Sequence, residues 1–270
     1  MKKIIVLAAV AAMLPVSLMA QTAPDGGLSP EVLSRISKGY TGTSYDKAVR
    51  NALAGSSVNV MATNAENASM IDTHFSDRVK TKGLTDQKSS GRCWLFTGLN
   101  VLRAKMIEKY NLGSFTFSQN YLFFYDQLEK ANLFLQGVID TRKLPFDDRK
   151  VDWLFSNPLS DGGQFTGVSD LAMTDGLVPS EVMPETYSSN NTSQMALQLK
   201  TILRQGGLAL RAAYDASPAA SAKGKNAAAA EAKVNAELLK IKESVLTDVY
   251  RILSLCLGVP PASFEWSMYD

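Results

Sequence analysis

Apolar residues recur at helical spacing along most of the chain, so the predicted elements are almost all helices. The run Ser-Pro-Glu at residues 29–31 is a helix-start signal, with serine as the cap and proline at the first helical position. Residues 45–53 follow with helical spacing and meet a stop at Gly55. Residues 57–62 are short and rich in small or β-branched types, which allows a strand there. The pattern predicts a helical N-terminal arm with loops over residues 21–83.

Two apolar helices are predicted in the middle of the chain. The first starts at Cys93 and runs to about Tyr110, and a helix this long with an inward apolar face is usually the central helix of a domain. The second, residues 119–135, is capped by Ser118, and helical spacing buries its aromatic residues in a core without any need for a ligand. The apolar positions are Trp94, Phe96, Val101, Leu102, Met106 and Ile107 in the first, and Tyr121, Leu122, Phe123, Phe124, Tyr125 and Leu128 in the second.

The remainder of the chain also favours helices. A turn at residues 161–164 precedes a predicted helix at about residues 166–175. Later helices are predicted for residues 194–205 and 227–257, and the Ala-rich piece, residues 227–236, has strong helix propensity but little apolar bulk. We therefore expect that piece at the surface, and a predominantly α-helical chain with very little strand.

Composition and charge narrow the classes of partner. The 270 residues are 46% hydrophobic and 20% charged, which permits a sizeable core. The formal charge of +2 is accounted for by Lys2 and Lys3, and without them 26 basic residues face 26 acidic ones. A neutral chain gives no reason to expect nucleic acid or an anionic membrane as a partner.

Residues 1–20 have the pattern of a secretory signal peptide. Two lysines are followed by an apolar stretch over residues 4–14, and Leu-Met-Ala at 18–20 is a tolerable cleavage site. The alternative is a membrane anchor, but the apolar run is too short to span a bilayer comfortably and Pro15 interrupts it. The sequence predicts an exported bacterial protein, periplasmic or secreted, with no membrane association after signal cleavage.

Candidate chemistry is concentrated in residues 87–94, Gln-Lys-Ser-Ser-Gly-Arg-Cys-Trp. Cys93 stands where a loop meets a predicted helix, and the positive end of the helix dipole favours a thiolate there. Its own backbone N–H can donate to an oxyanion, and the side-chain amide of Gln87 can provide a second donor. These residue types predict a cysteine nucleophile that attacks a carbonyl group.

A general base for this cysteine is not evident in the chain. His74 is the only histidine and lies upstream of Cys93. A lone histidine is more often a packed or surface residue than a base, and we do not expect His74 to act as one. The carboxylates Asp147, Asp148 and Glu185 are expected to be solvated or to cap helices.

No cofactor or metal is indicated. One histidine and two distant cysteines cannot form a plausible zinc site, and no Gly-rich phosphate loop is present. A disulfide between Cys93 and Cys256 would occupy the proposed nucleophile, so both are expected to be free thiols. Cys256 lies at an apolar helix end and is expected to pack as a small hydrophobic residue.

Residues 87–94 resemble the Gln…Cys-Trp motif of papain-like cysteine peptidases, and residues 85–96 are similar to the bleomycin hydrolase, or aminopeptidase C, branch. The resemblance covers roughly residues 75–270 and includes three further blocks in the same order. Extracellular papain-like enzymes commonly carry a disulfide-bonded cysteine where this chain has Ser90, and the bleomycin hydrolase branch typically lacks that bridge. The further blocks are residues 117–132, 161–164 and 257–266.

The resemblance implies an α+β papain-like fold that is incomplete in this chain. Residues 84–270 would be the helical half with family-specific helical insertions, and the β-rich half would be absent. Cys93 would be the nucleophile and Gln87 an oxyanion donor. Gly162 and Gly163 would offer backbone groups to an extended peptide, which the lack of a Cβ allows, although a plain turn before a helix is the alternative.

The resemblance also implies a function, and two alternatives to it remain open. The complete enzyme would be a cysteine aminopeptidase that cleaves short peptides through a thioester, assembled as a homohexamer. The family's catalytic histidine and asparagine have no counterpart here, so we expect a truncated chain that is inactive alone. A truncated pseudoenzyme that binds peptides or partner chains is the alternative, and a split enzyme with histidine and asparagine on a second chain is a third.

Overall fold

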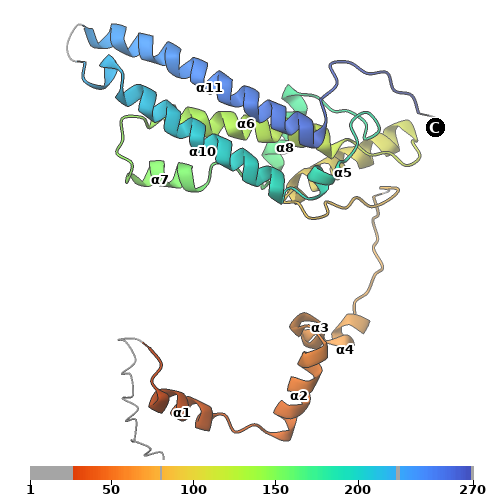
Figure 1. Ribbon diagram of the computed structural model, residues 1–270. Helices are drawn as coiled ribbons and strands as arrows, with labels where there is room; N and C mark the ends of the chain where they lie inside the picture. Colours follow the sequence, from red (N-terminus) through yellow and green to blue (C-terminus); the bar gives the residue numbers. More distant parts are fainter. Residues whose placement is uncertain (1–26, 80, 223–225, 269–270) are drawn as a thin grey trace, which may run out of the picture. The chain divides into compact units, whose positions relative to one another are not determined.

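The computed structural model describes residues 27–79, 81–222 and 226–268, and the chain divides into two compact units (Figure 1). The first unit ends at Phe75 and the second begins at Ser76. The predicted arm, residues 21–83, therefore extends eight residues into the second unit. The predicted signal peptide, residues 1–20, lies outside the described residues.

The first unit contains short helices that begin at capping side chains. Helix α1 (Pro30–Gly39) has Ser29 as its cap, as predicted, and the Ser29 hydroxyl accepts the Val32 N–H. Helix α2 (Ser44–Gly55) also matches the prediction, and Thr43 caps it. Helices α3 (Val58–Ala62) and α4 (Ala65–Ser69) follow. No described residue of this unit is buried.

The strand considered for residues 57–62 is wrong. Most of these residues form α3, which begins at Val58 and is capped by Ser57, whose hydroxyl accepts the Val60 N–H. Two β-branched valines do not outweigh a good cap when no neighbouring strand is available for pairing.

The second unit is built from longer helices. They are α5 (Cys93–Tyr110), α6 (Gln119–Asp140), α7 (Arg149–Ser156), α8 (Phe165–Thr174), α9 (Tyr187–Asn190), α10 (Ser193–Asp215), the 3-10 turn η1 (Pro218–Ala220) and α11 (Ala227–Leu257). The predicted ends of α5 and α11 are confirmed, and α8 lies within one residue of its prediction. Helices α6 and α10 run five and ten residues further than predicted.

Helices α6, α10 and α11 pack together into the main helical layer, with α10 and α11 forming a long antiparallel hairpin (Figure 1). Gly206 of α10 permits this close packing, because a Cβ there would lie 2.6 Å from Val245 of α11. The predicted aromatic core on α6 is confirmed, since Leu122, Phe123 and Phe124 are fully buried. Most of the Ala-rich start of α11 lies at the surface, as predicted.

Helix α5 lies against α8 and α6. Its predicted apolar face is correct at Trp94, Phe96 and Ile107, but Val101 is exposed and Arg103 is buried in its place. The guanidinium of Arg103 donates to the Gly83 carbonyl, so a neighbouring loop covers this side of the helix.

Strand structure in the described residues is limited to two isolated bridges, Ser89 with Asn191 and Phe117 with Pro179. This confirms the predominantly helical character predicted from the sequence. Within the same residues, none of the helices combines the length and apolar character needed to cross a bilayer.

Candidate active site

Cys93 is exposed and is the first residue of α5, as predicted. Arg92 occupies the cap position, but no side chain accepts from the first N–H groups of the helix. The Arg92 carbonyl instead begins the helical bonding by accepting from Leu95 and Phe96. An uncapped helix start leaves backbone donors unpaired beside the thiol.

Gln87 lies half-buried in the loop before α5. Its side-chain amide nitrogen donates to the Ser90 carbonyl at 2.6 Å, and the Ser90 hydroxyl donates back to the Gln87 carbonyl at 2.6 Å. An amide nitrogen carries two N–H groups, so this bond uses one of them. The other is the donor that an oxyanion would require.

Arg92 is a residue whose role the sequence analysis missed. It is fully buried, and its guanidinium donates to both carboxylate oxygens of Glu185 at 3.1 and 2.8 Å. It also lies against the rings of Phe96 and Phe123, with centroid distances of 5.0 and 5.1 Å. The prediction that Glu185 is solvated or a cap is wrong, because its carboxylate neutralises this buried cation. No local signal joins residues that are 93 positions apart.

The turn at residues 160–164 is fixed against the loop before Cys93 through Asp161. Its carboxylate accepts the Gly91 N–H at 3.2 Å and the Thr192 hydroxyl. Its carbonyl accepts the indole N–H of Trp94 at 2.8 Å. The structure thus brings together the two segments that the sequence analysis singled out separately.

Gly162 and Gly163 are both exposed, but they differ in what surrounds them. A Cβ on Gly163 would lie 2.5 Å from the Trp94 ring, whereas one on Gly162 would meet only the Ser160 hydroxyl, at 3.4 Å. The Gly162 N–H already donates to the Ser160 hydroxyl, and its carbonyl accepts from Lys130. Packing against Trp94 therefore requires glycine at position 163, independently of any role in binding a peptide.

Lys130 of α6 anchors the turn at residues 160–164 through its ammonium group. Its ammonium donates to the carbonyls of Gly162 and Ser160 at 2.7 and 3.0 Å and to the Asp126 carboxylate at 2.7 Å. It also lies 5.3 Å from the centre of the Trp94 ring. Burial raises the pKa of the Asp126 carboxyl, and the neighbouring Lys130 ammonium opposes that rise.

The other candidate residues lie apart from this arrangement. Cys256 on α11 is half-buried and packs against the core, and both cysteines are free thiols, as predicted. His74 belongs to the first unit and is exposed, with its backbone N–H bonded to Asp72. Asp148 caps α7, as predicted, by accepting the Lys150 N–H. Among the described residues, no three His, Cys, Asp or Glu side chains form a group that could hold a metal ion.

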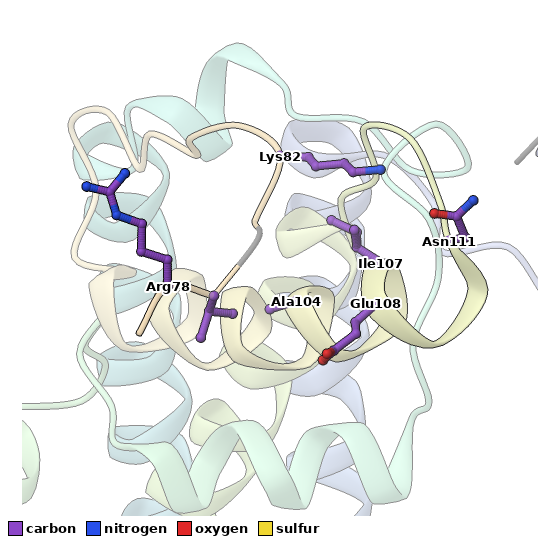
Figure 2. Close-up of a pocket in the computed structure, with 7 residues that line it drawn as sticks. Arg78, Lys82, Ala104, Ile107, Glu108 and Asn111 are labelled. Carbon is purple, nitrogen blue, oxygen red and sulfur yellow. The ribbon is translucent and has the colours of Figure 1, made fainter. Parts of the chain in front are cut away.

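A cavity of about 330 Å³ lies between the 78–82 segment and the second half of α5 (Figure 2). Ala104, its first lining residue on the helix, is eleven positions beyond Cys93, or roughly 16 Å along the axis. The candidate chemistry therefore lies on the open surface at the start of α5, and not in this cavity. The cavity is lined by Arg78, Val79, Lys82, Ala104, Ile107, Glu108 and Asn111.

A helical unit in which an exposed cysteine opens α5, packed against α6 and α8, matches the helical part of a papain-like cysteine peptidase fold. The chain belongs to the Peptidase C1-like family, which matches residues 27–270. The crystal structure of PepW from Lactobacillus rhamnosis agrees, with a TM-score of 0.73 and 32% identity over 88% of this chain and 50% of that one. The predicted fold class is confirmed.

Curated relatives place the chain in the predicted branch. Aminopeptidase C of Lactobacillus delbrueckii is 38% identical over 200 residues, which is 74% of this chain and 41% of that protein. Aminopeptidase G of the same organism is 35% identical over 90% of this chain and 52% of its own length. Bleomycin hydrolase of Gallus gallus is 37% identical over 70% and 39%. The chain thus spans about half, or less, of the length of these relatives.

Proposed function

We propose that Cys93 is the nucleophile of a cysteine aminopeptidase, with oxyanion donors from Gln87 and from its own backbone N–H. The observation that carries this proposal is the exposed thiol at the uncapped start of α5, beside a loop that holds the Gln87 amide. The names of the aminopeptidase relatives support the choice of substrate class. Gly162 and Gly163 would border the bound peptide.

The reaction would proceed by acyl transfer to sulfur. The Cys93 thiolate forms a C–S bond with the carbonyl carbon of the first residue, and the C=O π electrons move to the oxygen. The oxyanion accepts the N–H groups of Cys93 and Gln87. Its collapse breaks the C–N bond, and the leaving amine takes the proton that a general base removed from the thiol. Water then attacks the thioester, the C–S bond breaks, and the thiol is restored.

The proton acceptor is the part of the mechanism that these residues do not provide. The sequence contains one histidine, His74, and none after Cys93. We propose that the base lies in a further part of a longer protein or on a second chain, as the greater length of the relatives suggests. The 270-residue chain alone is then expected to be inactive, because the thiol depends on the helix terminus alone for activation.

The test begins with the DNA beyond the codon for Asp270 and uses the protein made from the complete reading frame. We expect Cys93→Ala to abolish release of the first residue from aminoacyl-nitroanilides, while Cys256→Ala retains it. Gln87→Ala is expected to lower kcat by about 10²–10³, the usual effect of removing one oxyanion donor. Peptide binding without any Cys93-dependent turnover would reject the enzyme and favour the peptide-binding pseudoenzyme. If the frame stops at Asp270, the same assay is run with candidate partner chains.

Export and assembly are further parts of the proposal. Export predicts that the protein recovered from the producing cells begins at Gln21 and lies outside the cytoplasm, which N-terminal sequencing of cell fractions can check. A homohexamer predicts a light-scattering mass six times that of the monomer for the complete protein. A cytoplasmic protein that begins at Met1 would reject the first, and a stable monomer would reject the second.

A further inference from the structure

We propose that the buried Arg92–Glu185 ion pair is a positioning device that holds the Gln87 side-chain amide in place through Ser90. The inference rests on the proposed function, because it assigns a reason for holding a donor beside Cys93. It concerns residues that would touch neither the substrate nor the reacting atoms. The residues are therefore positioning residues, and Ser90 is the connection between them and the donor.

A continuous series of hydrogen bonds joins the ion pair to the amide. The Glu185 carboxylate accepts one hydrogen bond from each terminal nitrogen of Arg92, and the Ser189 hydroxyl donates to Glu185 at 2.7 Å. The remaining guanidinium nitrogen, Nε, donates to the Ser90 hydroxyl at 3.0 Å. That hydroxyl donates to the Gln87 carbonyl, and the Gln87 amide donates to the Ser90 carbonyl. Gln87 is thereby tied at its backbone and at its side chain.

The Arg92 end of this series is rigid. Its side chain has no exposed surface, and one aromatic ring from α5 and one from α6 lie within about 5 Å of the guanidinium. The planar fork directs its N–H groups along fixed lines, two toward Glu185 and one toward Ser90. A lysine could not make this arrangement, because an ammonium is a single donor centre without a fork.

Stability alone is a poor explanation for this pair. A buried ion pair often contributes less than apolar residues of the same volume, because both charges lose their hydration. A cation at a helix N-terminus is also opposed by the helix dipole. The pair instead holds the loop that ends at the Cys93 thiol in one position. An oxyanion donor must be held within a few tenths of an ångström, so a fixed loop has a direct use here.

The experiment follows the Gln87 side-chain N–H pair by NMR in the ¹⁵N-labelled 270-residue chain. The signal is assigned by its loss in Gln87→Ala. Two variants cut the series at different points and are expected to fold: Ser90→Ala, and Arg92→Met with Glu185→Met, which replaces the ion pair by apolar residues. The matched control is Arg142→Met with Glu231→Met, which removes the ion pair between those residues, whose atoms lie 3.0 Å apart.

We expect a dispersed, slowly exchanging Gln87 pair in the unmodified chain and in the control. In both test variants its hydrogen exchange should become about tenfold faster or more, because the loop loses about one hydrogen bond of stabilisation and the amide separates from the Ser90 carbonyl more often. A Gln87 signal unchanged in both test variants, with the rest of the spectrum native, would overturn the proposal. So would an equal change in the control.

Turnover separates this inference from the proposed function. In the active complete protein, Ser90→Ala should lower kcat about tenfold and leave KM nearly unchanged, because the lost contact affects the oxyanion only through the position of the Gln87 amide. Faster exchange of the Gln87 pair in both test variants, in a protein that has no Cys93-dependent turnover at all, would support the positioning and reject the proposed function. Turnover in which kcat is unaffected by Ser90→Ala would overturn the positioning and leave the function standing.

Discussion

Helices α1 to α4 of the first unit each start at a side chain that accepts a backbone N–H, and none of them buries a residue. In the second unit, α5, α8, α10 and α11 have no such side chain, yet each buries two or more residues. The two regions thus hold their helices by different means. In the first unit, local hydrogen bonds define the starts of the helices. In the second unit, packing stabilises these helices even though no side chain caps their starts.

This difference has a consequence for chemistry. A helix that depends on its cap must use its first N–H groups for stability, as Thr43 shows for α2. Helix α5 is held by Trp94, Leu95 and Leu99 inside the core, so its first N–H groups can remain unpaired. An unpaired helix start beside an exposed thiol is what an oxyanion site requires.

The largest effect that separates the two regions should come from the core. Phe123→Ala is expected to lower the free energy of unfolding of the second unit by about 3–5 kcal/mol, because it leaves a cavity at a fully buried position. Leu33→Ala in the first unit, at a side chain that is 56% exposed, should change stability by about 0.5 kcal/mol or less. Urea unfolding followed by circular dichroism measures both, and similar losses would contradict the comparison.

The next effect concerns buried charge. Glu185→Ala leaves the fully buried Arg92 without its counter-charge and should cost about 3 kcal/mol of unfolding free energy. Glu231→Ala breaks the more exposed pairs with Arg142 and Lys143 and should cost clearly less than Glu185→Ala, because solvent screens those charges. Thermal unfolding of the two variants compares them directly. Equal costs would mean that the Arg92 environment is not the dry one described here.

Two adjacent glycines offer a smaller and sharper contrast within the second unit. Gly163→Ala places a methyl group against the Trp94 ring and should cost about 1–3 kcal/mol. Gly162→Ala has room for its methyl group and should change stability by about 0.5 kcal/mol or less. The melting temperatures of the two variants test this. A larger loss of stability in Gly162→Ala than in Gly163→Ala would contradict the close packing of Trp94 against Gly163.

In the first unit, the expected loss is local. Thr43→Ala removes the capping hydroxyl of α2 and should weaken that helix by about 1 kcal/mol. Amide hydrogen exchange should become faster in α2 and stay unchanged in the second unit. Ser44→Ala, one residue later, is the control and should not speed exchange in α2. A change in α6 or α10 on removal of Thr43 would show that the two regions are energetically linked.

The smallest effect is a difference in the sign of the pH dependence. Hydrogen bonds from Thr43 lower the pKa of Asp46, so the stability that Asp46 gives α2 is present above its unfolded pKa and is lost as pH falls through the folded value. Burial raises the pKa of Asp126 above its value in the unfolded chain. The second unit therefore loses stability as pH rises from the unfolded pKa of Asp126 through its folded pKa, and regains that stability on acidification. Carboxyl titration by NMR should place Asp46 below an ordinary aspartate and Asp126 above it. Both values on one side would reject the contrast.

Local signals predicted much of the fold correctly. The starts at Ser29 and Ser118 and the end of α5 at Asn111 each depend on a few neighbouring residues, so sequence alone located them. Asn111 adopts the left-handed conformation at φ 50°, which asparagine tolerates better than most residues. The lengths of α6 and α10 were underestimated, because their final turns continue by packing against neighbouring helices.

The candidate site divides in the same way. The sequence identified Cys93 and Gln87 because thiol, amide and helix start follow one another within seven residues. It also indicated the glycine turn, but it could not show that Asp161 joins that turn to Gly91. The prediction that Val101 lies on the inward face was wrong and the burial of Arg103 was not foreseen, since helical spacing alone does not fix which side of the helix a loop covers.

By itself, the sequence determined most of the helices, the candidate cysteine and the family, because each is encoded in short runs of residues. Only the tertiary structure decided that Arg92 meets Glu185, that Ser90 connects this pair to Gln87, and that Trp94 excludes a side chain at Gly163. Those contacts join residues up to 93 positions apart, and they form only when packing of the helices brings distant backbone segments to within hydrogen-bond distance.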